Sequence, residues 1–465
     1  MPSGTELSPL IQEQNPWWER PEYRSARTIP RRRDVFQNIF NYLGDASTGR
    51  AALLLGPRQV GKTTLLLQIA DELLDRGWPP GNLTFFDFSD DRLTEPISPR
   101  VIVGARSSGY RSDWPHVFLF DEIQEATAWQ RWLKAAVDES RREIRSERAL
   151  FIATGSSAGS LRDGTIESGQ GRWDEIPIEG LSYREFVRLN AFAPPGQEPE
   201  SIETVLGRDP TLFNRYLETG GFPEHALPAA MGGKPLARIR QDVVDRAILR
   251  DLRRSGVEID RVKRLFVYLV RQSGGIWNAQ DRAADLEADR KSVEEWLLLL
   301  ESTRLVHRLE SDRGPVKRPK AATQLRPRKK IYAADHGLVS ALSSGDPLSD
   351  PDIRGRLVEA AVFRHLREAS SVVDGRLGYF RRDDDLEIDF VWRSARGAAV
   401  AVEVTASRTL KGPKVARLQK AASLLGIARK LLVYDGIVST TGDLVEAIPL
   451  HEFLFEPVRF LEGSR

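Results

Sequence analysis

The chain has 465 residues, of which 41% are apolar and 29% are charged, and this composition is typical of a folded globular protein. A single hydrophobic core does not usually extend over so many residues, so the length predicts about three domains. The chain contains no cysteine, which excludes disulfides and thiolate-bound metals, and its net charge of +2 excludes a surface that is basic throughout. We find no signal peptide and no apolar run of about 20 residues, so we expect a cytoplasmic protein without a membrane span.

Residues 1–33 predict an irregular N-terminal arm, because five prolines interrupt any regular pattern there. Trp17 and Trp18 are the exception within this arm. Large aromatic side chains mainly supply burial, so we expect the two tryptophans to attach the arm to the surface of a domain. Residues 35–43 then have helical spacing and lead into the first strand.

The most informative segment is 51–70, where an apolar run, a glycine-rich loop and a helical pattern follow one another. The loop, residues 56–63, reads Gly-x-x-x-x-Gly-Lys-Thr. Its glycines allow backbone angles that turn successive N–H groups toward phosphate oxygens, and the following helix adds its positive N-terminal end. We expect Lys62 to reach the β and γ phosphates of ATP and Thr63 to ligate Mg²⁺. The predicted nucleotide contacts are Gly56, Pro57, Arg58, Gln59, Val60, Gly61, Lys62, Thr63 and Thr64.

Three further apolar runs, at residues 82–88, 116–124 and 149–157, alternate with helical patterns. This alternation predicts an α/β fold with a parallel sheet that is covered by helices on both faces. In such a fold, ligands bind at the carboxyl ends of the strands. The last two runs each end in polar residues, so we expect those residues to face the nucleotide.

Asp121 and Glu122 directly follow the apolar residues of one of these strands. In a P-loop ATPase, the aspartate at this place holds Mg²⁺ and the adjacent glutamate activates the attacking water. An acidic pair can also cap the next helix, but the preceding strand and the upstream loop favour the catalytic interpretation. At the end of the next strand, we expect Thr154 or Ser156 to contact the γ phosphate or the water, although the same segment would also serve as a turn and helix cap.

The middle of the chain predicts two helical regions. Residues 181–260 show apolar positions at three- and four-residue spacing, which predicts a helical lid over the nucleotide. Residues 262–310 predict two short helices, a longer helix and a strand, the outline of a winged helix. The stretch 313–330 that follows contains no acidic residue, so we expect it to contact a nucleic-acid backbone with an affinity that falls as salt rises. A protein-docking winged helix and a solvated wing are the alternatives, and no base-reading side chain can be named.

The remainder of the chain, from residue 330, predicts a second α/β region. A strand at its start is followed by an amphipathic helix, residues 354–369, which carries Glu359. Successive strand patterns then carry Asp389 and Glu403, and a helix near 414–425 precedes one more strand.

Taken together, these segments resemble the AAA-type P-loop ATPases of bacteria and archaea whose C-terminal half was long of unknown function. The resemblance begins near residue 34 and rests on GPRQVGKTTL, LFDEIQ, ATGSS, GRWDEIPIEGLSYREF, GGFPE, IYAADHGL, RGRLVEAAVFRHL, EIDFVW and AVEVTAS. It implies four parts after the arm: an ATPase core at 34–180, a helical lid at 181–260, a winged-helix-like segment at 261–329, and a domain similar to the PD-(D/E)XK nuclease fold at 330–465.

The resemblance also implies a homo-oligomer in which an arginine from a neighbouring subunit completes the ATP site. Arg172 is the first candidate for this arginine, and Arg250 and Arg253 are the second. Most arginines are solvated surface residues, and that alternative stays open for each of the three.

In the nuclease fold that the last domain resembles, a helix glutamate, a strand aspartate and a Glu-x-Lys motif gather around Mg²⁺. Glu359, Asp389 and Glu403 match the acidic positions and make a second candidate metal site, but Thr405 occupies the position of the lysine. Two lysines of the following helix could substitute for it, namely Lys411 and Lys414. We therefore expect a domain that serves in binding or assembly and does not cleave DNA.

Two functions of different classes fit the whole sequence. In the first, Mg²⁺-dependent ATP hydrolysis drives a DNA-associated motor or remodeller, with Lys62, Glu122 and Arg172 as the catalytic residues. In the second, the protein is a nucleotide-controlled switch that binds a protein partner, in a defence or toxin–antitoxin setting. The basic stretch and the nuclease-like domain favour the first. A metal-dependent nuclease is a third, less favoured interpretation.

Overall fold

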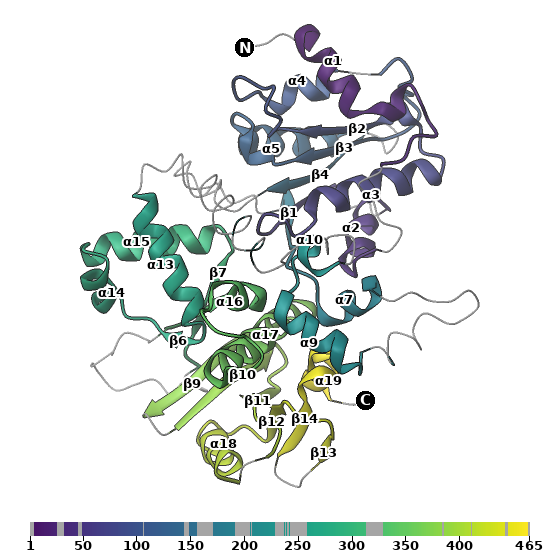
Figure 1. Ribbon diagram of the computed structural model, residues 1–465. Helices are drawn as coiled ribbons and strands as arrows, with labels where there is room; N and C mark the ends of the chain where they lie inside the picture. Colours follow the sequence, from purple (N-terminus) through teal and green to yellow (C-terminus); the bar gives the residue numbers. More distant parts are fainter. Residues whose placement is uncertain are drawn as a thin grey trace. The chain divides into compact units, whose positions relative to one another are not determined.

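The computed structural model divides the chain into two compact units, Met1–Ile178 and Glu179–Arg465 (Figure 1). The structure describes residues 4–25, 32–44, 49–105, 107–143, 148–155, 171–190, 205, 207–227, 237, 239, 241, 258–312, 329–383, 386–410, 412–441 and 445–463.

Unit 1 contains a five-stranded sheet with the strand order β2-β3-β4-β1-β5, and every pairing in it is parallel. The strands are β1 (Ala51–Leu55), β2 (Leu83–Asp87), β3 (His116–Asp121), β4 (Ala149–Gly155) and β5 (Trp173–Pro177), and the helices around them include α2 (Val35–Gly44), α3 (Lys62–Asp75), α4 (Pro99–Gly104) and α5 (Trp129–Ser140). Every residue of β1 and β3 is buried, which explains why these strands are apolar without alternation. The predicted parallel α/β fold is confirmed.

The strand order places the carboxyl ends of β1, β3 and β4 beside one another. Leu55 pairs with Gly155, and Phe120 pairs with Ala153. Because the three strands run in the same direction, the residues at their ends emerge at one edge of the sheet. This edge therefore carries the glycine-rich loop, Asp121 and Thr154.

The N-terminal arm is not irregular as predicted, because it contains helix α1 (Gly4–Gln14). Leu7 and Ile11 lie four residues apart on this helix and are both buried in the core of unit 1. Packing of this kind supplies most of the stability of a short helix, and here it outweighs the presence of Pro9. The prediction was wrong because it was based on the prolines and did not consider the helical spacing of Leu7 and Ile11.

After α1, the arm is attached to strand β2. Trp17 and Trp18 both donate their indole N–H groups to the carbonyl of Leu83, at 3.0 and 2.8 Å. Asn15 adds two hydrogen bonds with the backbone of Phe85, one donated to its carbonyl at 2.9 Å and one accepted from its N–H at 2.7 Å. The predicted role of the two tryptophans in attaching the arm is confirmed.

Unit 2 contains a six-stranded sheet with the order β13-β14-β12-β11-β10-β9. Its strands are β9 (Gly375–Asp383), β10 (Leu386–Ser394), β11 (Ala399–Thr405), β12 (Arg429–Tyr434), β13 (Thr440–Thr441) and β14 (Glu446–Pro449). Helix α18 (Gly412–Leu424) packs against one face through Leu418 and Ile388, and helix α17 (Pro351–Val372) packs its Phe363 near Phe390 of β10. The sheet thus lies between two helices.

The segment before this sheet contains three helices, α13 (Ile259–Arg271), α14 (Ala279–Asp285) and α15 (Arg290–Ser302). The same segment contains an antiparallel sheet of order β6-β8-β7, whose strands are β6 (Gly275–Ile276), β7 (Val306–Glu310) and β8 (Lys329–Ala333). The boundary predicted between residues 329 and 330 therefore falls inside β8. The sequence pattern placed β8 in the last domain because this strand directly precedes the helices of that domain. In the structure, the hydrogen bonds of β8 are with β6 and β7.

The described part of the predicted lid comprises α7 (Tyr183–Asn190), α9 (Pro210–Thr219) and α10 (Pro223–Ala226). It is joined to α16 (His336–Leu342) and α17 by buried polar contacts. Asp335 accepts hydrogen bonds from the N–H groups of Gly221 and Gly337, at 3.0 and 2.8 Å, and Arg364 donates to the carbonyl of Gly180. These residues belong to one buried network, so this part of the lid shares a core with the C-terminal region. No helix among the described residues is long and apolar enough to cross a membrane.

Candidate functional site

The glycine-rich loop between β1 and α3 has the backbone that its motif requires. Gly61 has φ +90° at the N-terminus of α3, and Gln59 has φ +65°. Left-handed residues within a turn direct successive N–H groups to one side, which is how such loops surround an anion. A Cβ atom at Gly56 would lie only 2.0 Å from the carbonyl oxygen of Ile178, so only glycine fits at that position.

Lys62 is buried within this loop, with 4% of its surface exposed. Its ammonium donates hydrogen bonds to the carbonyls of Gly56 and Pro57, at 3.0 and 2.8 Å. The positive charge therefore lies beside the turn and beside the first turn of α3, where the helix dipole is also positive. Both features favour a polyanion, and they fit the triphosphate of ATP.

Asp121 ends strand β3 and receives two hydroxyl hydrogen bonds. Thr63 Oγ1 donates to one carboxylate oxygen at 2.6 Å, and Thr154 Oγ1 donates to the other. Burial, together with the charge of Glu122, raises the pKa of Asp121 to about 6. A hydroxyl and a carboxylate are ligands that Mg²⁺ prefers, and a divalent cation would compensate the buried negative charge. Thr63 and Asp121 therefore fit the metal that the motif implies.

Glu122 stands next to this pair in a left-handed conformation, with φ +50°. Its N–H donates to Thr154 Oγ1 at 3.0 Å, so Thr154 bridges the backbone of Glu122 and the carboxylate of Asp121. The Glu122 carboxylate lies 3.6 Å from the guanidinium of Arg58 and accepts a hydrogen bond from Gln124. The structure thus brings Thr63, Asp121, Glu122 and Thr154 into one hydrogen-bonded group, as predicted from their positions.

Sequence reasoning assigned no role to Gln124 and treated Arg58 only as a loop residue. Gln124 is two residues after Glu122 in the segment LFDEIQ, and it lies against Gly155, where a Cβ atom would come within 2.8 Å of its side-chain oxygen. The small residue at the end of β4 was a usable signal, because it leaves room for a side chain from the neighbouring strand end.

Arg172 lies away from this group within its own unit. Its carbonyl accepts the N–H of Ala51, the first residue of β1, whereas the glycine-rich loop follows the last residue of β1. Its guanidinium contacts the carboxylate of Asp138 on α5 at 3.2 Å. The structure therefore does not bring Arg172 to the ATP site of the same chain. Four other predicted or substitute residues lie outside the described residues, namely Ser156, Arg250, Arg253 and Lys411.

In unit 2, the three carboxylates of the second candidate metal site lie near one another but are accompanied by lysines. The N–H of Asp389 donates to Glu403 at 3.4 Å, and the ammonium of Lys330 lies 3.5 Å from Glu359 and 3.9 Å from Asp389. Among the described residues, no group of three or more His, Cys, Asp or Glu is placed to hold a metal ion.

Glu403 has a lysine partner of its own. Of the two lysines considered as substitutes at the Thr405 position, Lys414 reaches the cluster, with its ammonium 3.2 Å from Glu403. Burial, together with the charge of Asp389, raises the pKa of Glu403 to about 8. Sequence reasoning missed Lys330, although Lys330 and Tyr332 alternate along β8 and therefore point to the same face.

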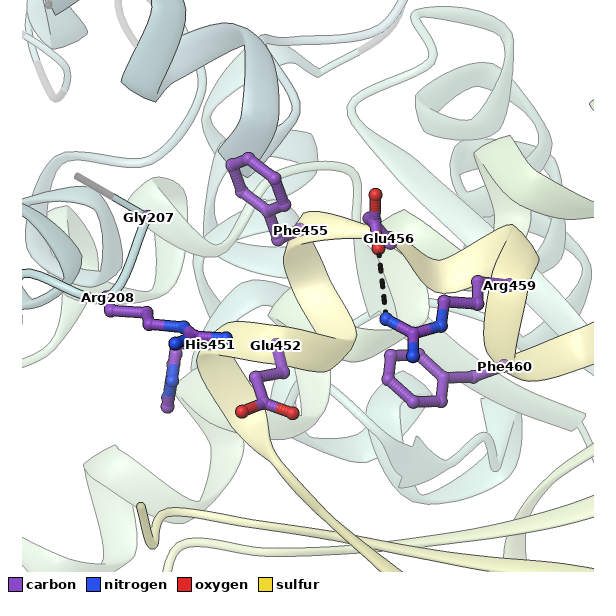
Figure 2. A pocket seen from close by; sticks show the side chains of 8 residues that line it. All are labelled: Gly207, Arg208, His451, Glu452, Phe455, Glu456, Arg459 and Phe460. Carbon is purple, nitrogen blue, oxygen red and sulfur yellow. Dashed lines mark hydrogen bonds and ion pairs between the residues drawn. The ribbon is translucent and has the colours of Figure 1, made fainter. Parts of the chain in front are cut away.

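Unit 2 also contains a cavity of about 100 Å³ beside α19 (Leu450–Phe455) and α20 (Pro457–Glu462), shown in Figure 2. Arg459 points toward Glu456, with which it forms an ion pair of 3.4 Å. The lining residues are Gly207, Arg208, His451, Glu452, Phe455, Glu456, Arg459 and Phe460. None of the predicted site residues is among them.

Comparison with known proteins supports the class of the first unit. Residues 48–187 match a family model described as an AAA domain. Residues 210–349 and 354–453 match two models described as domains of unknown function, DUF8612 and DUF4143. With the parallel sheet and the glycine-rich loop, the first match makes residues 48–187 a P-loop ATPase domain of the AAA type. The nuclease-like fold predicted for the last domain is not confirmed by these matches.

Similar solved structures include three proteins of low sequence identity. The RuvB Holliday junction branch migration motor of Thermotoga maritima is 17% identical, with 63% of this chain and 91% of that chain covered and a TM-score of 0.28. The Walker-type ATPase of Pyrococcus abyssi is 16% identical, with 68% and 99% covered and a TM-score of 0.36. AMPPCP-bound DnaA of Aquifex aeolicus is 14% identical, with 58% and 88% covered and a TM-score of 0.24. No curated protein sequence matches the chain significantly.

Proposed function

We propose that the AAA domain hydrolyses ATP with Mg²⁺ and that hydrolysis drives work on DNA by the rest of the chain. The observation that carries the catalytic part is the hydrogen-bonded group of Thr63, Asp121, Thr154 and Glu122 at the edge of the sheet that also bears Lys62. A binding loop alone does not need a buried carboxylate and a second, adjacent carboxylate at this edge.

Binding of ATP would use the N–H groups of residues 56–64, the ammonium of Lys62 and the N-terminus of α3. Lys62 donates to two loop carbonyls, and on ATP binding the same ammonium would donate to phosphate oxygens. Thr63 and Asp121 would hold Mg²⁺, which neutralises charge on the phosphates. The glycine-rich loop would therefore orient the triphosphate.

Glu122 would act as the general base that takes a proton from the attacking water. Thr154 fixes the backbone of Glu122 through its hydroxyl, and Gln124 and Arg58 hold the carboxylate. A base held by two such contacts loses little freedom when the water arrives, which favours a productive orientation. Thr154 thereby positions both carboxylates of the acidic pair.

The DNA-associated role rests on the basic stretch between β7 and β8. Residues 313–328 contain six Lys and Arg and no Asp or Glu, and they connect two strands that pair in an antiparallel hairpin. In the proposed function this basic connection would serve as the wing of a winged helix, an element that contacts the phosphate backbone. The alternative function, a nucleotide-controlled switch for a protein partner, would use the same hairpin as a docking element.

The deciding experiment measures ATP turnover with and without single-stranded, duplex and branched DNA, each at low and high salt. We expect DNA to stimulate turnover and the stimulation to decline with salt. The variant K62A should show no turnover in any condition, which tests the ATPase part separately. Turnover that depends on Lys62 but is unchanged by every form of DNA would contradict the DNA-associated role and favour the switch.

A further inference from the structure

Lys330 is almost completely enclosed by acidic side chains of unit 2. Only 4% of its side chain is exposed, and its ammonium lies 2.6 Å from Glu387, 3.5 Å from Glu359 and 3.9 Å from Asp389. The ammonium also lies 5.3 Å from the centre of the Tyr379 ring, within the range of a cation–π contact. Three carboxylates and an aromatic ring therefore surround one positive charge.

This lysine comes from a different sheet from the one that carries most of its partners. Lys330 is on β8, which pairs with β6 and β7, whereas Glu387 and Asp389 are on β10 of the six-stranded sheet. Tyr332 is two residues further along β8 and donates its hydroxyl to Glu359 at 2.7 Å. Lys330 and Tyr332 thus lie on one face of β8, and both contact the carboxylates.

The carboxylate cluster consists of Glu359, Glu387, Asp389 and Glu403, and each of these side chains has a lysine or arginine of this chain beside it. Lys330 contacts Glu359 and Asp389, Arg381 lies 3.6 Å from Glu387, and Lys414 lies 3.2 Å from Glu403. The second oxygen of Asp389 is also engaged, because it accepts the N–H of Val404 at 2.9 Å.

The electrostatics favour a charged lysine at this place. Burial alone would lower the pKa of Lys330, but the charges of Glu359, Asp389 and Glu387 raise it above its ordinary value. The ammonium is therefore charged throughout the physiological range. The nuclease motif itself places one lysine beside its metal, and Lys414 is the candidate for that lysine. Lys330 is a second ammonium that already contacts Glu359 and Asp389, so a divalent cation there would have to displace it or lie beside it, and the repulsion between cations opposes this. These residues do not fit the metal that the nuclease fold implies.

We propose that Lys330 is the permanent counter-ion of this carboxylate cluster, that it takes the place of a divalent cation there, and that it fastens β8 to the six-stranded sheet. The cluster is then a structural junction between the two sheets of unit 2. Removal of one member of a buried ion cluster leaves the others uncompensated, so the junction depends on the lysine charge.

The first test measures Mn²⁺ binding to the full chain without nucleotide. The variant T63A is used so that Thr63 and Asp121 do not contribute a binding site, and the result does not depend on the ATPase proposal. We expect T63A and the double variant T63A/D389N to bind Mn²⁺ equally weakly. Stoichiometric Mn²⁺ binding by T63A that is lost in T63A/D389N would overturn the proposal.

The second test compares the thermal stability of K330M and K329M. Lys329 is the neighbouring residue, about one-third exposed, and its ammonium lies 3.7 Å from Glu310, so it is a matched control for loss of one charge from β8. We expect K330M to lower the unfolding temperature by about 5 °C or more, or to prevent folding, and K329M to lower it far less. An unfolding temperature of K330M equal to that of K329M would contradict the role of Lys330.

Discussion

Thr63 donates a hydrogen bond of 2.6 Å to the carboxylate of Asp121, and this contact joins the first turn of α3 to the end of β3. The two strands that carry these residues to the edge are not neighbours, because β4 lies between β1 and β3. The contact therefore depends on the strand order of the sheet. It places a hydroxyl and a carboxylate, the two predicted Mg²⁺ ligands, in direct contact.

The first prediction concerns this hydroxyl. Replacement of Thr63 by Ala should reduce Mg²⁺-dependent ATP turnover by about 100-fold or more, because a metal ligand at the phosphates is lost. Thr63→Ser keeps the hydroxyl and should recover most of the turnover. Steady-state phosphate release at several Mg²⁺ concentrations measures the effect. Equal turnover of the Ala and Ser variants would show that the hydroxyl holds no metal.

The second prediction separates binding from hydrolysis at Glu122. Glu122→Gln retains the size of the side chain but cannot accept a proton, so we expect turnover to fall by about 10²–10⁴-fold while ATP still binds. Binding of a fluorescent ATP analogue and phosphate release should be measured on the same preparation. If the Gln variant hydrolyses ATP at the wild-type rate, Glu122 is not the general base.

The third prediction follows from the raised pKa of Asp121, about 6. Above this pH the carboxylate is ionised and can ligate Mg²⁺, and below it the folded protein takes up a proton there. We therefore expect the Mg²⁺ concentration needed for half-maximal turnover to rise as the pH falls through about 6. Thr154→Val removes a hydroxyl that donates to the ionised carboxylate, and this change should move the rise to higher pH. A half-maximal concentration independent of pH between 5 and 8 would contradict this role of Asp121.

The fourth prediction concerns Arg172, which lies by the amino end of β1 and contacts Asp138. If it completes the site of a neighbouring subunit, Arg172→Ala should lower turnover. Mixing Arg172→Ala subunits with K62A subunits, which are inactive but supply an intact arginine, should then restore part of the turnover. Asp138→Asn is a control that alters the same ion pair without removing the arginine. Equal losses in the two variants would indicate that Arg172 acts only through its contact with Asp138.

The arrangement of the candidate ATP site was predictable from the sequence because its signals are local. The strand, loop and helix around Lys62 follow one another along the chain, and Asp121 and Glu122 stand directly after a buried strand. A parallel sheet then brings the ends of such strands to one edge without further information. The motifs did not predict the contacts of Arg58 and Gln124 with Glu122, because these contacts depend on side-chain conformation.

The cluster around Lys330 was not predictable in the same way. Its carboxylates come from α17 and β10, which follow Lys330 in the chain without any fixed spacing, and the lysine stands at the end of a basic stretch whose other members suggest solvent exposure. The approach of β8 to the larger sheet is a tertiary contact. Helix α1 was missed for a related reason, since its stability comes from packing of Leu7 and Ile11 on the core.

The last prediction concerns the stability of unit 2 in acid and rests on His365. Its Nδ1 lies 2.7 Å from the carbonyl of Ala361, and its Nε2 accepts the N–H of Tyr183 at 3.0 Å. The ring is therefore neutral, with its proton on Nδ1. Burial, followed by the charge of Arg364, holds the pKa of His365 well below its ordinary value, and His336 is a further neighbour.

A histidine with a lowered pKa destabilises the folded state in acid. Below a pH of about 6.5 the unfolded chain takes up a proton that the folded chain does not, so the free energy of unfolding decreases as the pH falls from 6.5 toward the folded pKa. The effect is at most about 1.4 kcal/mol per pH unit for one histidine. Glu359 and Glu403, whose pKa values are raised to about 7 and about 8, act in the opposite direction, because the folded state binds their protons first.

The contribution of His365 is therefore measured as a difference between variants. Denaturant unfolding of the wild-type chain and of His365→Gln should be compared at pH 7.5, 6.5 and 5.5, with the two-state free energy taken at each pH. Because Gln does not titrate, we expect the variant to lose less stability than the wild type between pH 6.5 and 5.5, whatever its stability at pH 7.5. His451→Gln, at a half-buried residue on the cavity of Figure 2, should change the slope less. Identical slopes for the wild type and His365→Gln would show that the pKa of His365 is not lowered in the folded protein.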